Sequence, residues 1–275
     1  MPSVLVTGSS SGIGRATVER LAGDGWRVYA GVRDFADGTA LDQISENVVA
    51  LPLDVTDEAQ IAATVTELTA RADGALDGVV ANAGIGVGGA LEEIEPDRLR
   101  EVFDVNVVGA VAVTQAVLPM LRRAGGTVVM VGSIGGRVAM PFGGPYHATK
   151  YALEALADSW RLELRPQGVS VALVEPSTTS TPIWAKARKE VEDQIATLDA
   201  EGRRLYAERL GEFADQLRSA DETGGEADKV AGKIAAALAG SGGRYPVGRG
   251  AGVITRLRPL VPDLVWDRVV GRFSP

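Results

Sequence analysis

A tyrosine and a lysine four residues apart are the side chains in this sequence best suited to acid–base chemistry. They are Tyr146 and Lys150, in the stretch Tyr-His-Ala-Thr-Lys. On a helix, residues four apart lie on one face, one turn apart. A phenol titrates at about 10, too high for a base at neutral pH, but a neighbouring ammonium favours the phenolate. The pair could therefore exchange a proton with an alcohol or carbonyl oxygen.

A serine precedes this pair at the end of an apolar run. Thr127–Val131 predicts a buried strand, and Ser133 stands just beyond it, in Val131-Gly132-Ser133. We expect its hydroxyl to hydrogen-bond the same substrate oxygen that Tyr146 serves. A tyrosine and a lysine at this spacing also occur by chance, so the pair gains its weight from the surrounding motifs.

A glycine-rich turn near the N-terminus predicts a dinucleotide site. It lies between an apolar strand, Ser3–Thr7, and a segment with helical spacing, Ile13–Leu21. Glycines let the backbone approach a pyrophosphate, and the N-terminus of the following helix offers free N–H donors and partial positive charge. The cofactor-binding residues predicted in this turn are Gly8, Ser10, Ser11, Gly12, Ile13 and Gly14.

The end of the second predicted strand bears on the choice of cofactor. In many NAD-binding units an acidic residue at this place accepts a hydrogen bond from the ribose 2′-OH. Here Val32 occupies that place and Arg33 follows, and a guanidinium suits a 2′-phosphate. We therefore predict a preference for NADP(H), with NAD(H) as the alternative. Two other interpretations stay open: Arg33 pairs with a surface acid such as Asp34, or Asp34 serves a 2′-OH in a shifted register.

Strands and helices alternate along most of the chain, which predicts an α/β fold. Near-continuous apolar strands separated by helices are typical of a parallel sheet covered on both faces. We predict a single-domain, Rossmann-type doubly wound sheet of about seven strands over residues 1–275. The predicted strands are Ser3–Thr7, Arg27–Val32, Asn47–Leu53, Gly78–Ala81, Thr127–Val131, Val169–Val174 and Arg244–Val247. The predicted helices are Ile13–Leu21, 57–71, 96–123, 146–164 and 228–238.

Two segments fall outside this alternation. Residues 183–222 have apolar residues at helical spacing in two halves separated by Gly202, and they predict a helical lid over the site. Residues 250–275 form a C-terminal extension in which arginines alternate with apolar residues. We expect this extension to pack on the body of the protein, and contact with a membrane surface is the alternative.

Composition excludes several classes of site. The chain of 275 residues has no cysteine and a single histidine, His147, so neither disulfides nor a metal site are expected. The formal net charge of −8 does not suit nucleic-acid binding. No signal peptide precedes the first strand, and the longest apolar stretch, Val107–Leu121, is shorter than the ~20 residues of a membrane span. We expect a cytoplasmic protein.

Taken together, these motifs resemble those of the short-chain dehydrogenase/reductase family. The resemblance runs from Ser3 to Val247, nearly the whole chain. The matching motifs, in order, are the glycine turn Thr7–Gly14, Asn82-Ala83-Gly84 after the fourth strand, Asn106, Ser133 and the pair Tyr146-x-x-x-Lys150.

The resemblance implies roles for four residues in catalysis. Tyr146 would be the acid/base, and Lys150 would lower the pKa of that phenol and hold the nicotinamide ribose. Ser133 would orient the substrate carbonyl, and Asn106 would anchor a water in a proton relay. The chain would thus be an NAD(P)-dependent oxidoreductase that interconverts a secondary alcohol and a ketone.

The resemblance also implies further contacts to the cofactor. One departure weakens a contact: the family usually has Pro-Gly after the sixth strand, whereas this chain has Pro176-Ser177, and serine lacks the freedom of glycine. The additional residues implied are Asp54, Val55, Asn82, Ala83, Gly84, Pro176 and Thr181.

A finer resemblance is to the branch that holds 17β-hydroxysteroid dehydrogenase type 1-like and retinol dehydrogenase-like enzymes. It rests on Val28–Asp34, Leu51–Val55, Asp104–Gly109 and Pro141-Phe142. It implies a bulky apolar substrate, steroid- or retinoid-like. The expected pocket residues are Val138, Met140, Phe142, Ile183 and Trp184.

Two alternative functions are compatible with a dinucleotide-binding fold, and the family resemblance also implies an oligomeric state. A protein that senses NADP(H) without catalysis is the main alternative, although such proteins usually lose the tyrosine or lysine that this chain keeps. An epimerase or dehydratase is less compatible with the glycine spacing. Family members commonly pair through the helices that carry Asn106 and Tyr146, so we expect a homodimer or homotetramer.

Overall fold

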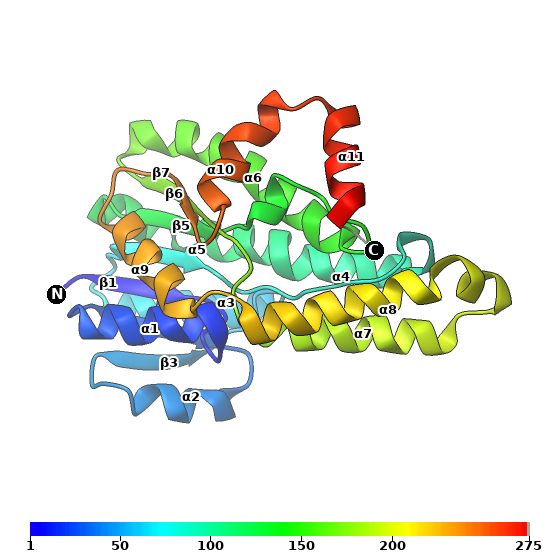
Figure 1. The fold of residues 1–275 in the computed structure, drawn as a ribbon. Coiled ribbons are helices and arrows are strands. Elements are labelled where there is room, and N and C mark those ends of the chain that lie inside the picture. The colour runs from blue at the N-terminus through cyan, green and yellow to red at the C-terminus, as the bar shows by residue number, and fades with distance from the viewer. Residues whose placement is uncertain (274–275) are drawn as a thin grey trace.

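The computed structural model describes residues 1–273 and has one seven-stranded parallel sheet at its centre (Figure 1). The strand order is β3-β2-β1-β4-β5-β6-β7. The fold class predicted from the alternation of strands and helices is confirmed. The strands are β1 Ser3–Val6, β2 Arg27–Val32, β3 Val48–Pro52, β4 Gly78–Ala81, β5 Thr127–Val131, β6 Ser170–Pro176 and β7 Gly243–Val247.

Eleven α-helices accompany the sheet in the described residues. Most of them connect one parallel strand to the next, as a parallel sheet requires. They are α1 Gly12–Gly23, α2 Phe35–Asp42, α3 Glu58–Arg71, α4 Pro96–Phe103, α5 Ala110–Ala124, α6 Gly144–Leu164, α7 Ile183–Thr197, α8 Ala200–Thr223, α9 Ala227–Leu238, α10 Ala251–Leu257 and α11 Asp263–Phe273.

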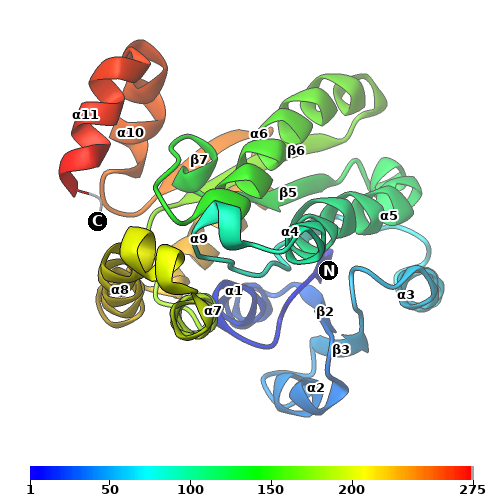
Figure 2. The same cartoon turned by 90° about the vertical axis from the view of Figure 1, so that its right-hand side faces the viewer.

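The two faces of the sheet build two separate cores. Successive side chains of a strand point to opposite faces, so Leu5 packs in one core while Val4 and Val6 pack in the other. The first core is completed by α3, α5 and α6, and the second by α1, α2 and α9 (Figure 2). Burial on both faces explains why the strands are continuous apolar runs.

Strand order reverses between β1 and β4, and this reversal locates the site. The connection from β1 runs by way of β2 and β3 on one side, and β4 then pairs with β1 on the other. At such a reversal the loops at the carboxyl ends of the strands diverge and leave a crevice, where ligands of open α/β sheets bind. Every loop considered below leaves the sheet at this edge.

Three elements differ from the sequence-based expectations. Helix α2 was not expected, because its sequence FADGTALD lacks an apolar repeat. The single helix expected over 96–123 consists of α4 and α5, joined by a turn of π-helix over Asp104–Gly109. The lid helices divide at Leu198 and Asp199, where the Asp199 side chain caps α8, so Gly202 lies inside α8 and does not separate the halves.

The run Pro96–Ala124 is long and apolar enough to cross a membrane by length and composition alone. Its packing accounts for that apolar character. Val113, Val117 and Leu121 are buried in the first core, against the sheet. We therefore assign the run to the core of the fold.

Candidate active site

One cleft of about 980 Å³ lies along the carboxyl edge of the sheet. Loops that follow β1 to β6 form one side of it. Side chains of α7, α8, α10 and α11 contribute to the other side. The cleft is therefore bounded on one side by strand ends and on the other by helices.

The glycine turn after β1 lines this cleft through five of its six predicted residues. Gly8 and Gly12 both have left-handed backbone conformations, with φ of +65° and +53°, which glycine adopts without strain. At Ser11, the N-cap of α1, no side-chain hydrogen bond caps the first turn within the described chain. The backbone N–H groups there are available to a phosphate. The lining residues are Gly8, Ser10, Ser11, Gly12 and Ile13.

Gly14 has a different task from the one predicted, because it does not line the cleft. A Cβ at this position would overlap the Gly8 carbonyl oxygen and would lie 2.6 Å from Asn82 Nδ2. Asn82 Nδ2 in turn donates to the carbonyl oxygens of Thr7 (2.9 Å) and Gly8 (3.1 Å). Gly14 therefore lets α1 pack against the turn, and Asn82 fixes the shape of the turn from the end of β4.

The end of β2 presents Arg33 to the cleft. Its side chain is exposed and contributes to the cleft lining. The neighbouring carboxylate is already engaged, because Asp34 is the N-cap of α2 and accepts from the backbone N–H of Ala36 at 2.9 Å. The arrangement suits an anion near Arg33 better than a ribose hydroxyl at Asp34.

The remaining predicted cofactor residues also line the cleft. Asp54 is held in a turn in which its carboxylate accepts from the backbone N–H (2.9 Å) and hydroxyl (2.7 Å) of Thr56. Thr181 lies next to the glycine turn, with its methyl carbon 3.0 Å from where a Cβ on Gly12 would stand. The residues in this group are Asp54, Val55, Asn82, Ala83, Gly84, Pro176 and Thr181.

Tyr146, Lys150 and Ser133 come together at the middle of the cleft. Tyr146 and Lys150 lie on consecutive turns of α6, and Lys150 Nζ is 5.5 Å from the centroid of the tyrosine ring. Lys150 Nζ also donates to the Val131 carbonyl oxygen at 2.9 Å, which ties α6 to the end of β5. Ser133 lines the same part of the cleft, near enough to the phenol to lower its pKa. The three predicted side chains thus form one constellation.

Burial sets the protonation of this constellation. It raises the pKa of the Tyr146 phenol, and the hydrogen bond from Ser133 opposes that rise. Burial also lowers the pKa of Lys150 to about 8, because an ammonium loses hydration there. In the protein without ligands the phenol is therefore protonated and ready to donate a proton. The lowered phenol pKa predicted from the sequence would require added positive charge in the cleft.

Asn106 is buried beside this constellation and does not line the cleft. Its Oδ1 accepts from the backbone N–H of Ile85 at 2.7 Å, and its Nδ2 donates to the Ile85 carbonyl oxygen and to the Thr149 hydroxyl. Asn106 sits in the π-helical turn, a local feature that often marks functional sites. The side chain therefore joins the loop after β4 to α6.

His147, next to Tyr146 in the sequence, forms part of the cleft wall. Its Nδ1 lies 3.1 Å from the Gly135 carbonyl oxygen, and Gly135 and Gly143 flank the ring so closely that neither has space for a Cβ. Burial lowers the pKa of the imidazole, so it is neutral at pH 7. The ring thus acts as an uncharged wall.

The apolar side of the cleft contains four of the five predicted pocket residues. Val138, Met140, Ile183 and Trp184 line it, and the Trp184 ring packs edge-on to Tyr146 at 6.5 Å. The prediction for Phe142 is wrong. Phe142 has a φ of +62° and does not line the cleft; its ring packs 5.8 Å from that of Phe213, within the apolar cluster of the lid helices.

Sequence reasoning missed the cleft residues contributed by the far end of the chain. Apolar side chains of α8, α10 and α11 complete the wall, and an amide lies among them. Aromatic residues at helical spacing within 206–217 and 253–266 were the signal in the sequence that could have indicated these lining residues. The additional lining residues are Phe213, Gln216, Leu217, Ile254, Trp266, Val269 and Val270.

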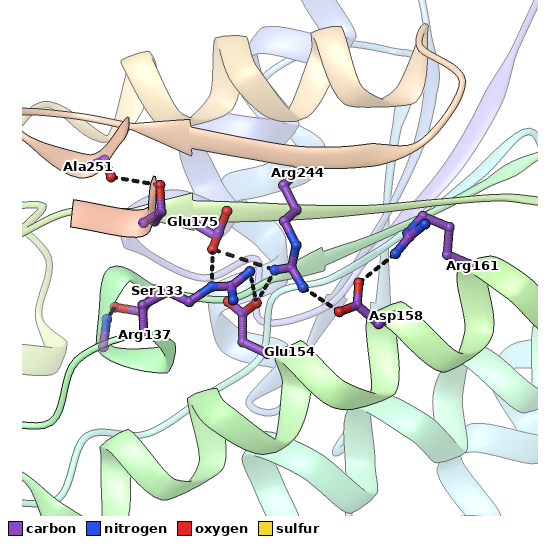
Figure 3. A network of polar contacts seen from close by, with 10 residues as sticks. Ser133, Arg137, Glu154, Asp158, Arg161, Glu175, Arg244 and Ala251 are labelled. Atoms are coloured by element: carbon purple, nitrogen blue, oxygen red, sulfur yellow. Dashed lines mark hydrogen bonds and ion pairs between the residues drawn. The ribbon is translucent and has the colours of Figure 1, made fainter. Parts of the chain in front are cut away.

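A cluster of charges surrounds Glu154 of α6, close to Ser133 (Figure 3). Glu154, one turn after Lys150 on α6, pairs with Arg137 at 2.9 Å and also with Arg244 of β7. Glu175 of β6 pairs with Arg137 at 3.1 Å and with Arg244 at 3.6 Å. Asp158 binds Arg244 at 2.6 Å. These five residues, the charge cluster, join the turn after Ser133 to α6, β6 and β7.

The charge cluster holds two carboxylates that are almost fully buried. Glu154 Oε1 and Glu175 Oε2 accept no hydrogen bond from any described residue. Burial and the neighbouring Glu175 raise the pKa of Glu154 to about 7, against the opposing effect of Arg244 and Arg137. Glu154 therefore changes its charge near neutral pH.

Comparison with known proteins gives the family. A family model described as short chain dehydrogenase matches residues 2–192. Human 17-beta-hydroxysteroid dehydrogenase type 1 is 35% identical, over 82% of this chain and 72% of that protein. The NADPH-dependent 3-dehydrocapnine reductase of Ornithobacterium rhinotracheale is 30% identical, over 98% of this chain and 96% of that protein.

Solved structures agree with this assignment. The crystal structure of a short-chain dehydrogenase from Streptomyces avermitilis superimposes with a TM-score of 0.79 at 29% identity, and covers 100% of this chain and 98% of that one. The match extends beyond the residues of the family model and includes the helical side of the cleft. The chain therefore belongs to the short-chain dehydrogenase/reductase family and is an oxidoreductase that uses a nicotinamide cofactor.

Proposed function

We propose that this protein is an NADP(H)-dependent oxidoreductase that interconverts a bulky, apolar secondary alcohol and the corresponding ketone. The observation that carries the cofactor choice is the end of β2, where Arg33 lines the cleft and Asp34 is engaged as the cap of α2. A guanidinium there would bind a 2′-phosphate by charge and by paired hydrogen bonds. The relative from Ornithobacterium that is named as NADPH-dependent supports the same choice.

Removing the guanidinium tests this choice. We expect Arg33→Ala to weaken NADPH binding by ~1.5–3 kcal/mol, the contribution of a charged hydrogen bond, and to leave NADH binding nearly unchanged. Fluorescence titration of each cofactor measures both affinities. Arg15→Ala is the matched control, because Arg15 is exposed on α1 and pairs with Glu19 away from the cleft. Equal losses for both cofactors, or a wild-type preference for NADH, would refute the proposal.

The proposed roles of the chain's own residues follow from the geometry. In the reducing direction the Tyr146 phenol would donate its proton to the carbonyl oxygen, and in the oxidising direction the phenolate would take that proton back. Ser133 would hold the same oxygen, and the buried Lys150 ammonium would stabilise the phenolate. When bound, the nicotinamide supplies or accepts the hydride, and its oxidised form adds the positive charge that favours the phenolate.

The apolar side of the cleft supports a bulky substrate. Val138, Met140, Trp184, Phe213 and Trp266 give the cleft a large apolar part of its wall. Helices α7 and α8 would act as a lid over this part of the cleft. A steroid- or retinoid-like molecule fits such a wall, and the human relative is named as a hydroxysteroid dehydrogenase.

A substrate panel tests this part of the proposal. Hydroxysteroids, retinoids and aliphatic ketones should be assayed with both cofactors, and we expect the polycyclic or long-chain compounds to give the highest kcat/KM. Preference for small polar carbonyl compounds would refute the substrate class. NADPH binding without turnover of any compound would favour a sensor.

We also propose that the protein forms a homodimer or homotetramer through the outer faces of α5 and α6. Exposed apolar side chains on and beside these helices, Val108, Tyr151 and Leu162, support the proposal. Light scattering at micromolar concentration should give a mass of at least twice that of the chain. A monomer at that concentration would refute it.

A further inference from the structure

The C-terminal helices α10 and α11 gather exposed apolar side chains more densely than the rest of the molecule. Twelve large apolar side chains are exposed in the part of the chain that the structure describes, and six of them lie between residues 253 and 269. The pair of helices stands at the edge of the protein beyond β7 (Figures 1 and 2). These six residues, the C-terminal apolar face, are Val253, Leu257, Leu260, Leu264, Val265 and Val269.

Concentrated exposure of this kind calls for a partner. Leu260 is 77% exposed and Leu264 is 66% exposed, although leucine gains free energy when it leaves water. Soluble proteins rarely keep contiguous apolar patches without a binding role. Leu260 ends the 3-10 turn after α10 and Leu264 lies in the first turn of α11, so the two leucines occupy the bend between the helices.

The charge of the same segment is opposite to that of the rest of the protein. Residues 249–275 contain five arginines and two aspartates, a formal charge of +3, so the remaining residues carry −11. Arg256 and Arg268 are exposed on α10 and α11, beside the C-terminal apolar face. An apolar face flanked by arginines on helices is typical of segments that lie on anionic lipid surfaces.

The asymmetry of charge would also orient the molecule. Electrostatic attraction to a membrane surface decays within a Debye length, about 8 Å at physiological ionic strength. Only the basic segment would therefore experience the attraction strongly, and the acidic remainder would be held on the water side. A second copy of this chain would present the same +3 segment, so pairing of two C-terminal apolar faces would bring like charges together.

The inner side of the helix pair belongs to the cleft. Ile254, Trp266 and Val270 line it together with Phe213 and Leu217 of α8, and Val269 belongs to both the cleft lining and the exposed face. Trp266 is also covered by the Arg258 guanidinium at 5.2 Å, an arrangement that combines an aromatic ring with a cation as at membrane interfaces. A bilayer under the C-terminal apolar face would therefore lie beside the apolar end of the cleft.

We propose that the C-terminal apolar face docks the protein on an anionic lipid surface, with the apolar end of the cleft next to the bilayer. An apolar substrate could then pass between lipid and cleft without crossing water. Only the passage of substrate rests on the proposed function. Docking itself is tested by vesicle binding, which requires no turnover, so the two proposals can fail separately.

Vesicle sedimentation with the full chain tests the proposal. The probes are vesicles of phosphatidylcholine alone and vesicles with about 30% phosphatidylglycerol. We expect the wild-type protein to bind the anionic vesicles and to be released by high salt. Leu260→Asp and Leu264→Asp should each lower the bound fraction at least about tenfold, because a carboxylate would enter the lipid interface. The double variant Arg256→Gln/Arg268→Gln should bind both vesicle types equally weakly.

Leu205→Asp is the matched control, since Leu205 is 42% exposed on α8 and does not line the cleft. It should bind vesicles like the wild type, and light scattering should give one mass for all variants. Wild-type protein that stays in the supernatant with both vesicle types would overturn the proposal. So would an equal loss in Leu205→Asp. A fall in mass with Leu260→Asp would identify the face as an interface between copies instead.

Discussion

The two sides of the cleft are built in different ways. The side formed by strand ends uses backbone: glycines with positive φ, a helix N-terminus and side chains such as Asn82 that bond to main-chain oxygens. The side formed by helices uses apolar side chains, among them Trp184 and Phe213, on segments far from one another in the chain. The first side can recognise a ligand common to a whole family, whereas the second can change its shape by substitution.

Tyr146 lies between the two sides of the cleft. Loss of its hydroxyl group alone should therefore lower the catalytic rate more than any other substitution considered below. Tyr146→Phe keeps the ring and its packing on Trp184 and removes only the proton that moves. General acid–base groups contribute roughly 10²–10⁴ in rate. We expect kcat to fall by about 10³ or more and NADPH affinity to stay within about twofold. Stopped-flow turnover and cofactor titration measure the two effects.

The pH profile of alcohol oxidation sharpens the same test. The limb that rises with deprotonation of the phenol should vanish in Tyr146→Phe. Tyr151→Phe, on the exposed side of α6, is the control and should keep both the rate and the limb. If Tyr146→Phe retains more than about a tenth of wild-type turnover, the assigned proton transfer is wrong.

A substitution on the helical side should separate substrate binding from cofactor binding. Trp184→Ala removes a ring that lines the cleft beside Tyr146, and also loses the hydrogen bond from Nε1 to the Thr179 carbonyl oxygen. We expect KM for a bulky apolar ketone to rise about tenfold and the NADPH dissociation constant to change little. Steady-state kinetics with a bulky and a small ketone measure the difference.

The contrast between the two ketones is the informative part of this experiment. The small ketone should lose less, because it touches less of the wall. Leu205→Ala, outside the cleft on α8, serves as the control. A comparable loss of NADPH affinity in Trp184→Ala would mean that the two sides of the cleft are not independent.

The smallest expected effect comes from the charge cluster, and it concerns stability. The pKa of Glu154 is raised from 4.5 to about 7 in the folded protein, so the folded form keeps a proton that the unfolded chain loses. The contribution to the free energy of unfolding is fully present below pH 4.5 and is lost as pH rises to about 7. Glu154→Gln cannot ionise, so this part of the pH dependence should disappear.

Urea unfolding at several pH values between about 5 and 7.5 measures that slope. Glu19→Gln is the control, because Glu19 is an exposed carboxylate paired with Arg15 on α1 and should leave the slope unchanged. Parallel curves for wild type and Glu154→Gln would show that Glu154 is ionised throughout this range.

The same division explains what the sequence could predict. Strands such as Thr127–Val131 are continuous apolar runs, and the glycine turn depends on local backbone conformation. Both features can therefore be predicted from a few consecutive residues. Ser133, Tyr146 and Lys150 came together as predicted because one strand end and one helix carry all three.

Features that depend on distant contacts escaped the sequence analysis. Phe142 packs with the lid helices and has a left-handed backbone, which no pattern of residue types indicates in a non-glycine residue. The charge cluster joins Arg137, Glu154, Glu175 and Arg244, which are up to about a hundred residues apart, so their pairing depends on the packing of β6 and β7 beside α6. The cleft residues of α11 depend on the path of the C-terminal extension.

The close packing around Gly14 has a consequence for evolution and for protein engineering. Since any Cβ there would collide with the Gly8 carbonyl group and with Asn82, Gly14 cannot be replaced without moving the turn. The end of β2 is less constrained, because Arg33 is exposed there. An engineer who wishes to vary the cofactor site would therefore substitute Arg33, which is exposed, and keep Gly14, the buried Val32 and the helix cap Asp34.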